Sequence, residues 1–232
     1  MNAFDEAISD NTVDLDKISE IVSVGKVTLN DALNWAGKKG YLEVVKYLIS
    51  EGAENLNQAL IWTSRGGNNL ETIEYLISKG ANNLNNALGQ AAMGGNLDNI
   101  KFLVNQGAND LNDALLWASL NGHLNIVKFL VNQGANDFDE ALHWASLGLH
   151  IEVMGFLIEN GANLDKLKCK KYIKIAIQLK KENDELMQQL YMPGGKEFDK
   201  ASERFYSNQK ILNEMKLNIM KLDSKWGKSA IN

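Results

Sequence analysis

The chain has 232 residues and is 45% hydrophobic, which is enough for one or two domains with a buried core. It contains no run that approaches the roughly 20 apolar residues of a membrane span, and the acidic start Met1–Glu6 lacks the apolar segment of a secretory signal peptide. The single cysteine, Cys169, excludes an intrachain disulfide and favours a reducing, cytoplasmic location. A single proline, Pro193, favours an all-helical protein.

The net charge of −5 is unevenly distributed along the chain. Residues 165–232 carry 15 Lys/Arg and 9 Asp/Glu, whereas residues 1–164 carry 9 Lys/Arg and 20 Asp/Glu. The two parts are therefore expected to be separate regions. The acidity of residues 1–164 argues against nucleic acid as their ligand.

Residues 1–28 look like a degenerate copy of the unit that follows them. Phe4–Ala7 is similar to the opening of that unit, and a set of apolar residues and one glycine lies 27 residues before its counterparts at 42, 45, 48, 49 and 52: Leu15, Ile18, Ile21, Val22 and Gly25. An acidic, degenerate first unit is typical of a solvent-facing cap.

Five recognisable repeats follow, starting at residues 29, 56, 84, 111 and 138. Each opens on a word such as Leu-Asn-Asp-Ala-Leu and ends on Gly-Ala, and Lys101–Asp110 recurs unchanged as Lys128–Asp137. Repetition at a fixed period indicates a stacked array, which we place at residues 1–164.

Each repeat is predicted to contain two helices. In the fourth repeat the first helix spans 112–120, with Asn112 or Asp113 capping it, and a turn at 121–123 follows. The second helix spans 124–131, ends before Gly134 and has an apolar stripe at helical spacing: Leu124, Val127, Leu130 and Val131. Neither helix can bury its stripe alone, so neighbouring units must stack.

These words resemble the ankyrin repeat over residues 4–164: Gly122-His123 matches the turn of that family, and Gly134-Ala135-Asn136 matches its ending. The unit of 27 residues is shorter than the family's, which has about 33. The missing residues fall where ankyrin repeats usually carry a β-hairpin finger. The resemblance therefore implies an all-α, ankyrin-like helical solenoid with little or no β-hairpin.

Individual repeats depart from the pattern at three places. The second full repeat has one extra residue near Asn68-Asn69, and the third has Gln90 where the others have tryptophan. The last has Leu149 instead of the turn glycine, a role that we expect Gly148 to assume.

The resemblance implies a binding surface on the concave face of the first helices. Residues that vary between repeats near the ends of these helices are the candidates for partner binding: Lys38, Lys39, Arg65, Met93, Leu120, Asn121 and Leu147. Met93, Leu120 and Leu147 are expected to form an apolar strip, either for a partner or for the C-terminal segment.

Two recurring residue types have alternative interpretations. Tryptophan recurs at one position of the first helix, at Trp35, Trp62, Trp117 and Trp144, and serves either as an aromatic strip for a partner or as a ladder packed between helices. His123 and His150 lie one repeat apart at the family's turn, where a hydrogen bond between repeats is favoured over a metal.

Residues 165–232 are predicted to form a helical hairpin. The first helix spans 165–191, Met192–Gly195 breaks it, and the second carries a heptad seam from Phe198 to Trp226. The hairpin is interpreted as a cap for the array, as a coiled coil for homodimerisation or partner binding, or as a further functional domain. A basic run from Lys166 to Lys174 is either a solvated helix face or a patch for nucleic acid or an anionic membrane surface.

The sequence contains no phosphate loop, metal-ligand cluster or nucleophile–base pair, so no catalytic, cofactor-binding or metal residues are assigned. We predict a non-catalytic module that binds a partner protein. The shortened, asparagine-rich repeats are similar to those of giant viruses and intracellular bacteria, which implies an effector or adaptor acting in host cytosol. The alternative is that the C-terminal segment carries the activity, by dimerisation or catalysis, with the repeats as receptor.

Overall fold

The computed structural model describes residues 8–9, 12–25, 27–67, 69–167, 170–190 and 196–223. The chain forms two compact units, residues 1–117 with 132–134, and residues 118–131 with 135–232. We call them the N-terminal unit and the C-terminal unit. The division falls inside α8 (Leu111–Leu120). The domain boundary after residue 164 remains a proposal from the repeat pattern.

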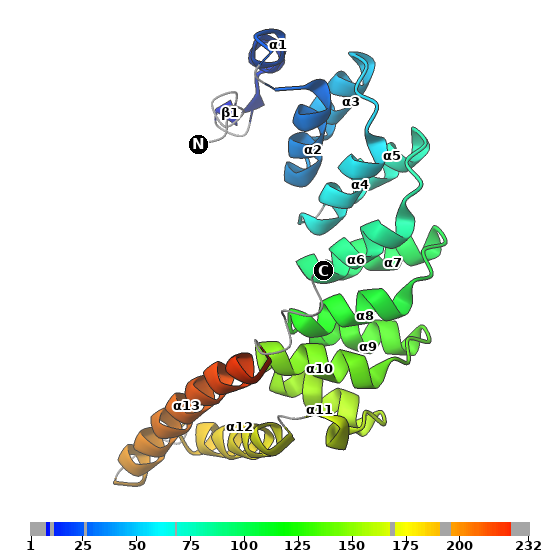
Figure 1. The fold of residues 1–232 in the computed structure, drawn as a ribbon. Coiled ribbons are helices and arrows are strands. Elements are labelled where there is room, and N and C mark those ends of the chain that lie inside the picture. The colour runs from blue at the N-terminus through cyan, green and yellow to red at the C-terminus, as the bar shows by residue number, and fades with distance from the viewer. Residues whose placement is uncertain are drawn as a thin grey trace. The chain divides into compact units, whose positions relative to one another are not determined.

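The N-terminal unit begins with a two-residue antiparallel pair, β1 (Ile8–Ser9) and β2 (Thr12–Val13), and then α1 (Leu15–Ser23). Helices in pairs follow: α2 (Leu29–Lys39), α3 (Leu42–Ser50), α4 (Leu56–Arg65), α5 (Leu70–Ser78), α6 (Leu84–Gly94) and α7 (Leu97–Asn105). The predicted opening Phe4–Ala7 lies outside the described residues. Among the described residues the all-α fold with little β structure is confirmed (Figure 1).

The core of this unit is built from the recurring apolar words. The first helices α2, α4 and α6 pack side by side, the second helices α3, α5 and α7 do the same, and each pair packs together (Figure 1). The Ala-Leu pair in the middle of each first helix is fully buried, as at Ala59-Leu60, and so are Ile73 and Leu76 of α5. Stacking thus buries both stripes, as the repeat pattern predicts.

Asparagine side chains hold the loops between successive repeats, at the place where longer repeats carry a β-hairpin finger. The side-chain oxygen of Asn57, the second residue of α4, accepts hydrogen bonds from the backbone N–H groups of Asn82 and Asn83, at 2.8 and 3.0 Å. The side chains of Asn30 and Asn85 accept equivalent pairs of bonds from 54–55 and 109–110. The Leu-Asn opening of each repeat therefore fastens the loop that enters the next repeat.

The predicted cap of the fourth repeat's first helix is wrong. α8 begins at Leu111, and the side chain of Asp110 accepts a long hydrogen bond, at 3.4 Å, from the backbone N–H of Asp113. Asn112 and Asp113 lie inside the helix because the acidic residue just before it occupies the capping position.

The C-terminal unit contains α9 (Leu124–Asn132), α10 (Phe138–Gly148), α11 (Ile151–Glu159), a short 3-10 helix (Leu164–Lys166), α12 (Lys170–Leu190) and α13 (Lys196–Asp223). In α9, Val127 and Leu130 are buried as predicted, Ile126 is buried as well, and Leu124 and Val131 are half-buried. Gly134 has the left-handed φ of 108° predicted for a helix end.

α12 and α13 form the predicted hairpin, and both helices also pack on the last repeat, α12 on α11 and α13 on α10. The heptad positions face inward: Ala176, Asn183, Leu186, Ala201, Asn208, Leu212 and Met215 are buried. The side chain of Asn208 donates a 3.0 Å hydrogen bond to that of Asn183 within this seam. The break at 191–195, Trp226 and the side chains of Phe198, Ile219 and Leu222 lie outside the described residues.

Leu149 takes the turn glycine's role itself, so the prediction that Gly148 replaces it is wrong. Gly148 is the last residue of α10, and Leu149 has the left-handed conformation, with φ 53° and ψ 43°. It is the one described non-glycine residue with positive φ. Its side chain packs against the cluster of Ala176, Leu212 and Met215. The glycine is therefore replaced where the hairpin needs an apolar contact.

Candidate binding surface

The candidate residues of the N-terminal unit lie at the last turns of the first helices. Lys38 and Lys39 end α2, Arg65 ends α4, and Met93 is the penultimate residue of α6. The lysines and the arginine are exposed and Met93 is half-buried. The three helices present different side chains at one structural position, which is what a surface that selects a partner requires.

Backbone contacts show that these helix ends form a continuous row. A Cβ at Gly66 would lie 2.6 Å from the Lys38 carbonyl oxygen, and a Cβ at Gly94 would lie 2.3 Å from that of Arg65. The side chain of Asn96 also donates to the Arg65 carbonyl, at 3.0 Å. The ends of α2, α4 and α6 therefore abut in order, and we call Lys38, Lys39, Arg65 and Met93 the helix-end row.

The tryptophans lie among the helices beside this row. Trp35 is buried and its ring packs on Tyr41 with centroids 5.5 Å apart. Trp62 is half-buried, and the Lys38 ammonium lies 5.7 Å from the centre of its ring. Trp117 approaches Gly89 of α6 so closely that a Cβ there would lie 3.3 Å from the indole. The contacts of Trp62 and Trp117 join neighbouring repeats and that of Trp35 joins the two helices of one repeat, in agreement with the ladder interpretation.

The remaining candidates belong to the C-terminal unit. Leu120 and Leu147 are half-buried and Asn121 is exposed. The ring Nε2 of His150 lies 2.8 Å from the carbonyl oxygen of Leu120, which is a hydrogen bond between successive repeats. Burial lowers the pKa of His150, although the bond to Leu120 opposes the shift. The structural interpretation of this histidine is supported, and the strip from Met93 to Leu147 remains a prediction.

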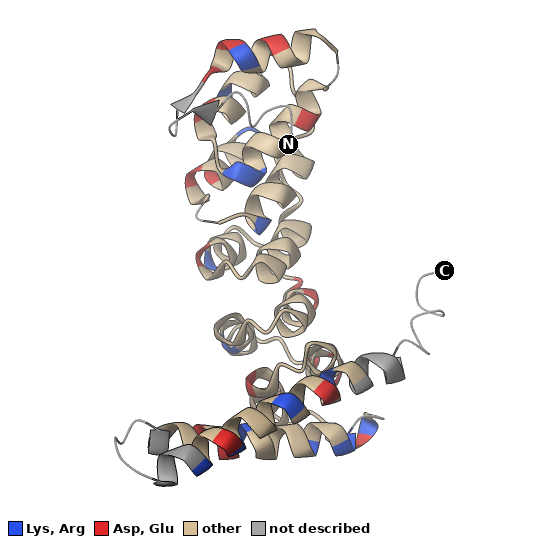
Figure 2. Ribbon diagram, turned by 90° about the vertical axis from the view of Figure 1, so that its left-hand side faces the viewer, with Lys and Arg blue, Asp and Glu red and all other residues tan. Residues whose placement is uncertain are grey.

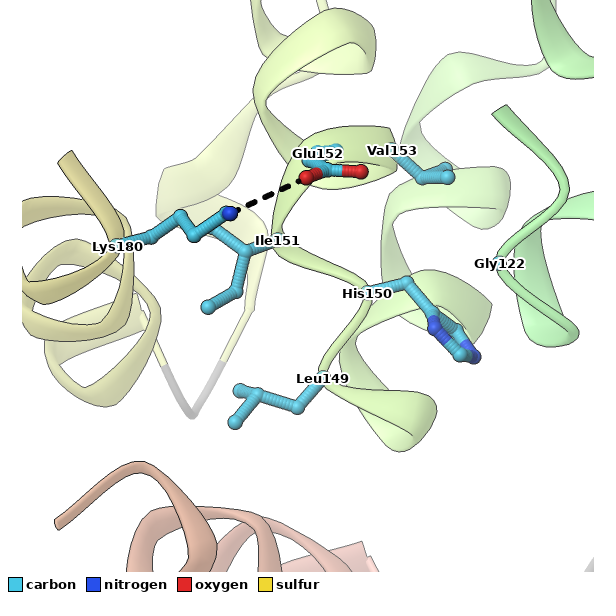
Figure 3. A pocket seen from close by; sticks show the side chains of 7 residues that line it. All are labelled: Gly122, Leu149, His150, Ile151, Glu152, Val153 and Lys180. Atoms are coloured by element: carbon cyan, nitrogen blue, oxygen red, sulfur yellow. Dashed lines mark ion pairs between the residues drawn. The ribbon is translucent and has the colours of Figure 1, made fainter. Parts of the chain in front are cut away.

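A hollow of about 230 Å³ lies beside the start of α11 (Figure 3). The Lys180 ammonium reaches across it to within 3.3 Å of the Glu152 carboxylate, while the His150 ring points toward Gly122 on the other side (Figure 3). Lys180 also pairs with Asp184 at 2.9 Å. The charges that line the hollow therefore satisfy each other.

Two lysines of the predicted basic run are neutralised within the C-terminal unit. Lys166 pairs with Asp139 at 2.5 Å, and Lys170 pairs with Asp165 at 3.3 Å. Lys171 and Lys174 are exposed, and Lys168 and Cys169 lie outside the described residues. Basic and acidic residues both occur on α12 and α13 (Figure 2), although along α12 the lysines precede the acidic residues. Charges of both signs are typical of a solvated helix surface.

Two other kinds of feature are absent from the same described ranges. No three His, Cys, Asp or Glu side chains there are grouped so that they could hold a metal ion. None of the helices there is both long and apolar enough to cross a membrane.

Comparison with known proteins identifies the fold family. A family model described as ankyrin repeats (3 copies) matches residues 33–113 and 88–168, which together are more than half of the chain. The human ASB11 ankyrin repeat domain is similar in structure, with 21% sequence identity and a TM-score of 0.48, and the similarity covers 57% of this chain and 70% of that one. No curated protein matches the sequence. Ankyrin repeats generally mediate protein–protein interaction and are generally non-enzymatic, and this chain belongs to the ankyrin repeat family.

Proposed function

We propose that the protein is a non-catalytic binding module that holds a partner protein on the ends of its first helices. The observation that carries the proposal is the helix-end row, where residues that differ from repeat to repeat lie side by side, with the lysines and the arginine exposed and Met93 half-buried. Residues that serve stacking recur in the repeats, whereas these do not. Leu120, Asn121 and Leu147 are proposed as the partner-binding residues of the C-terminal unit.

The hairpin is proposed to act as a cap rather than as the active part. Most of its described heptad side chains are buried within the chain, and Tyr172, Leu179 and Phe205 are half-buried, so most of the seam is engaged in internal packing. The exposed apolar residues Tyr206 and Leu217 lie eleven positions apart on α13, which is close to three helical turns and therefore one side of the helix. They are the residues through which the alternative, a hairpin that binds a partner or a second copy, would operate.

We also propose that the protein acts in a cytoplasm, and in host cytosol if it is an effector or adaptor of an intracellular pathogen. The proposal rests on the single cysteine and on the resemblance of the short, asparagine-rich repeats. Localisation of the tagged full chain in infected and uninfected cells tests it.

A quantitative pull-down from eukaryotic cytosol with the full chain tests the binding surface. The first variant carries Lys38→Gln, Arg65→Gln and Met93→Gln. The matched control carries Lys46→Gln, Lys79→Gln and Lys101→Gln on the second-helix side of the same unit. The hairpin variant carries Tyr206→Ser and Leu217→Ser.

We expect the wild-type chain to bind a partner protein that the helix-end variant does not bind. The control and the hairpin variant should still bind it. A loss of roughly tenfold or more is expected if these side chains are central to the interface, since central residues dominate binding energy. A partner that is lost only with the hairpin variant would transfer the function to the C-terminal segment. Circular dichroism of each variant ensures that loss of binding is not loss of fold.

A further inference from the structure

We propose that the helix-end row takes an acidic, extended peptide segment of its partner. The inference rests on the proposed function and adds the chemistry of the ligand. Lys38, Lys39 and Arg65 are the basic residues of the first helices in the described part of the N-terminal unit, and all three lie at adjoining helix ends. The one acidic residue of α2, Asp31, lies in its first turn and bonds to Thr28.

Acidic residues gather on the other side of each helix pair. The second helices and the turns after them carry Glu43, Glu51, Glu54, Glu71, Glu74 and Asp98. Lysines there have acidic or aromatic neighbours: Lys46 pairs with Glu43 at 2.7 Å, and Lys101 pairs with Asp98 at 3.5 Å. Lysine is thus matched on that side, whereas within the described residues Lys38, Lys39 and Arg65 form no ion pair.

The helix-end row also has the groups that a carboxylate-rich segment needs besides charge. Arginine offers a planar fork that binds carboxylate through two parallel hydrogen bonds. Lys38 over Trp62 and the half-buried Met93 supply apolar surface for the stems of ligand side chains. Basic residues in the last turn also stabilise their own helices through the macrodipole, and that role leaves the ammonium and guanidinium groups open to a ligand.

The size of the row fits a short segment. Packed helices lie about 8–10 Å apart, so three adjoining ends span about 20 Å, which an extended chain covers with about six residues. A nucleic acid would extend its charge well past this row, and residues 1–164 carry 20 acidic against 9 basic residues. A short acidic peptide matches a local basic row in an acidic protein better than a long polyanion does.

The test is a selection of random peptides of about ten residues, a length that covers the row, on the immobilised full chain. Three forms of the protein are compared: the wild type, the variant Lys38→Glu with Arg65→Glu, and the control Lys46→Glu with Lys101→Glu, which reverses the same number of charges on the second helices. One enriched peptide is then labelled with fluorescein and titrated at about 50 and about 200 mM NaCl, with a random-sequence DNA duplex as competitor. Lys38→Gln with Arg65→Gln repeats the titration without introducing negative charge.

We expect peptides rich in Asp and Glu from the wild type and the control, and loss of that excess with the charge-reversed row. The labelled peptide should bind about tenfold more weakly to the charge-reversed variant, with an intermediate loss for the glutamine variant and weaker binding at the higher salt. The same acidic excess from all three forms, or a preference for the duplex, would overturn the inference. Enriched peptides without acidic excess that are lost with Met93→Gln would overturn it too, while leaving the proposed function in place.

Discussion

Leu149 destabilises the chain through its left-handed backbone conformation and stabilises it through the packing of its side chain. Two substitutions separate these effects. An L-residue in the left-handed conformation is about 1–2 kcal/mol higher in energy than in its usual backbone conformation. Glycine carries no such penalty. The side chain in turn contacts the hairpin cluster of Ala176, Leu212 and Met215. Leu149→Ala keeps the backbone cost and removes the contact, whereas Leu149→Gly removes both.

The expected changes in stability follow from the burial of the Leu149 side chain. Leu149 is half-buried, and the three carbon atoms lost in Leu149→Ala contribute about 0.8 kcal/mol each when fully buried. About half of that sum, on the order of 1 kcal/mol, should be lost from the docking of the hairpin. Leu149→Gly loses the same contact but regains about 1 kcal/mol of backbone strain. The glycine variant should therefore be close to wild type and more stable than the alanine variant.

Native-state hydrogen exchange of the α12 and α13 amides is the suitable assay, because unfolding of a repeat protein need not be two-state. Leu149→Ala should speed this exchange about fivefold, and Leu149→Gly should change it little. Leu147 is the matched control, since it is also half-buried but lies inside α10, where glycine costs about 1 kcal/mol more than alanine. Equal exchange in Leu149→Ala and wild type would refute the docking role, and equal exchange in the two variants would refute the strain.

Three further predictions concern polar contacts. Asn57→Ala should lower the free energy of unfolding by about 1–2 kcal/mol in urea denaturation, whereas Asn57→Asp should lose little, because Asp139 serves the same role with a carboxylate. Burial lowers the pKa of His150 in the folded chain, so the free energy of unfolding should be highest above about pH 6.5 and fall as the pH drops below that value. His150→Asn should flatten this pH dependence, measured as the urea midpoint at each pH. Asn208→Leu alone should cost about 1–3 kcal/mol by removing the donor to the buried side-chain oxygen of Asn183, and adding Asn183→Leu should restore the thermal midpoint.

Sequence reasoning predicted most of the fold because burial repeats along the chain. The period of the Ala-Leu word fixes which faces are apolar, and stacking is the one way to bury them. Caps and turns were less predictable, since Asp110 and Asn112 are both good capping residues and the choice depends on where the helix starts. The role of Asn57 was missed for a different reason: its partners lie 25 and 26 residues away. The recurrence of asparagine as the second residue of the first four repeats, with Asp139 in the fifth, was the available signal.

Some residues differ from their counterparts in the other repeats because of a contact inside the chain. Such residues are not candidates for partner binding. Leu149 departs because it docks the hairpin, and position 89 is glycine because a Cβ there would lie 3.0 Å from the Asp113 carboxylate and 3.3 Å from the Trp117 indole. Asn69, next to the extra residue, places its side chain where a Cβ at Gly40 would lie, so it belongs to the turn. Arg65 differs from its counterparts in the other repeats, is exposed, and forms no ion pair within the described residues. Variation that packing does not require is the variation that a partner can use, and that reasoning directs the first experiment to the helix-end row.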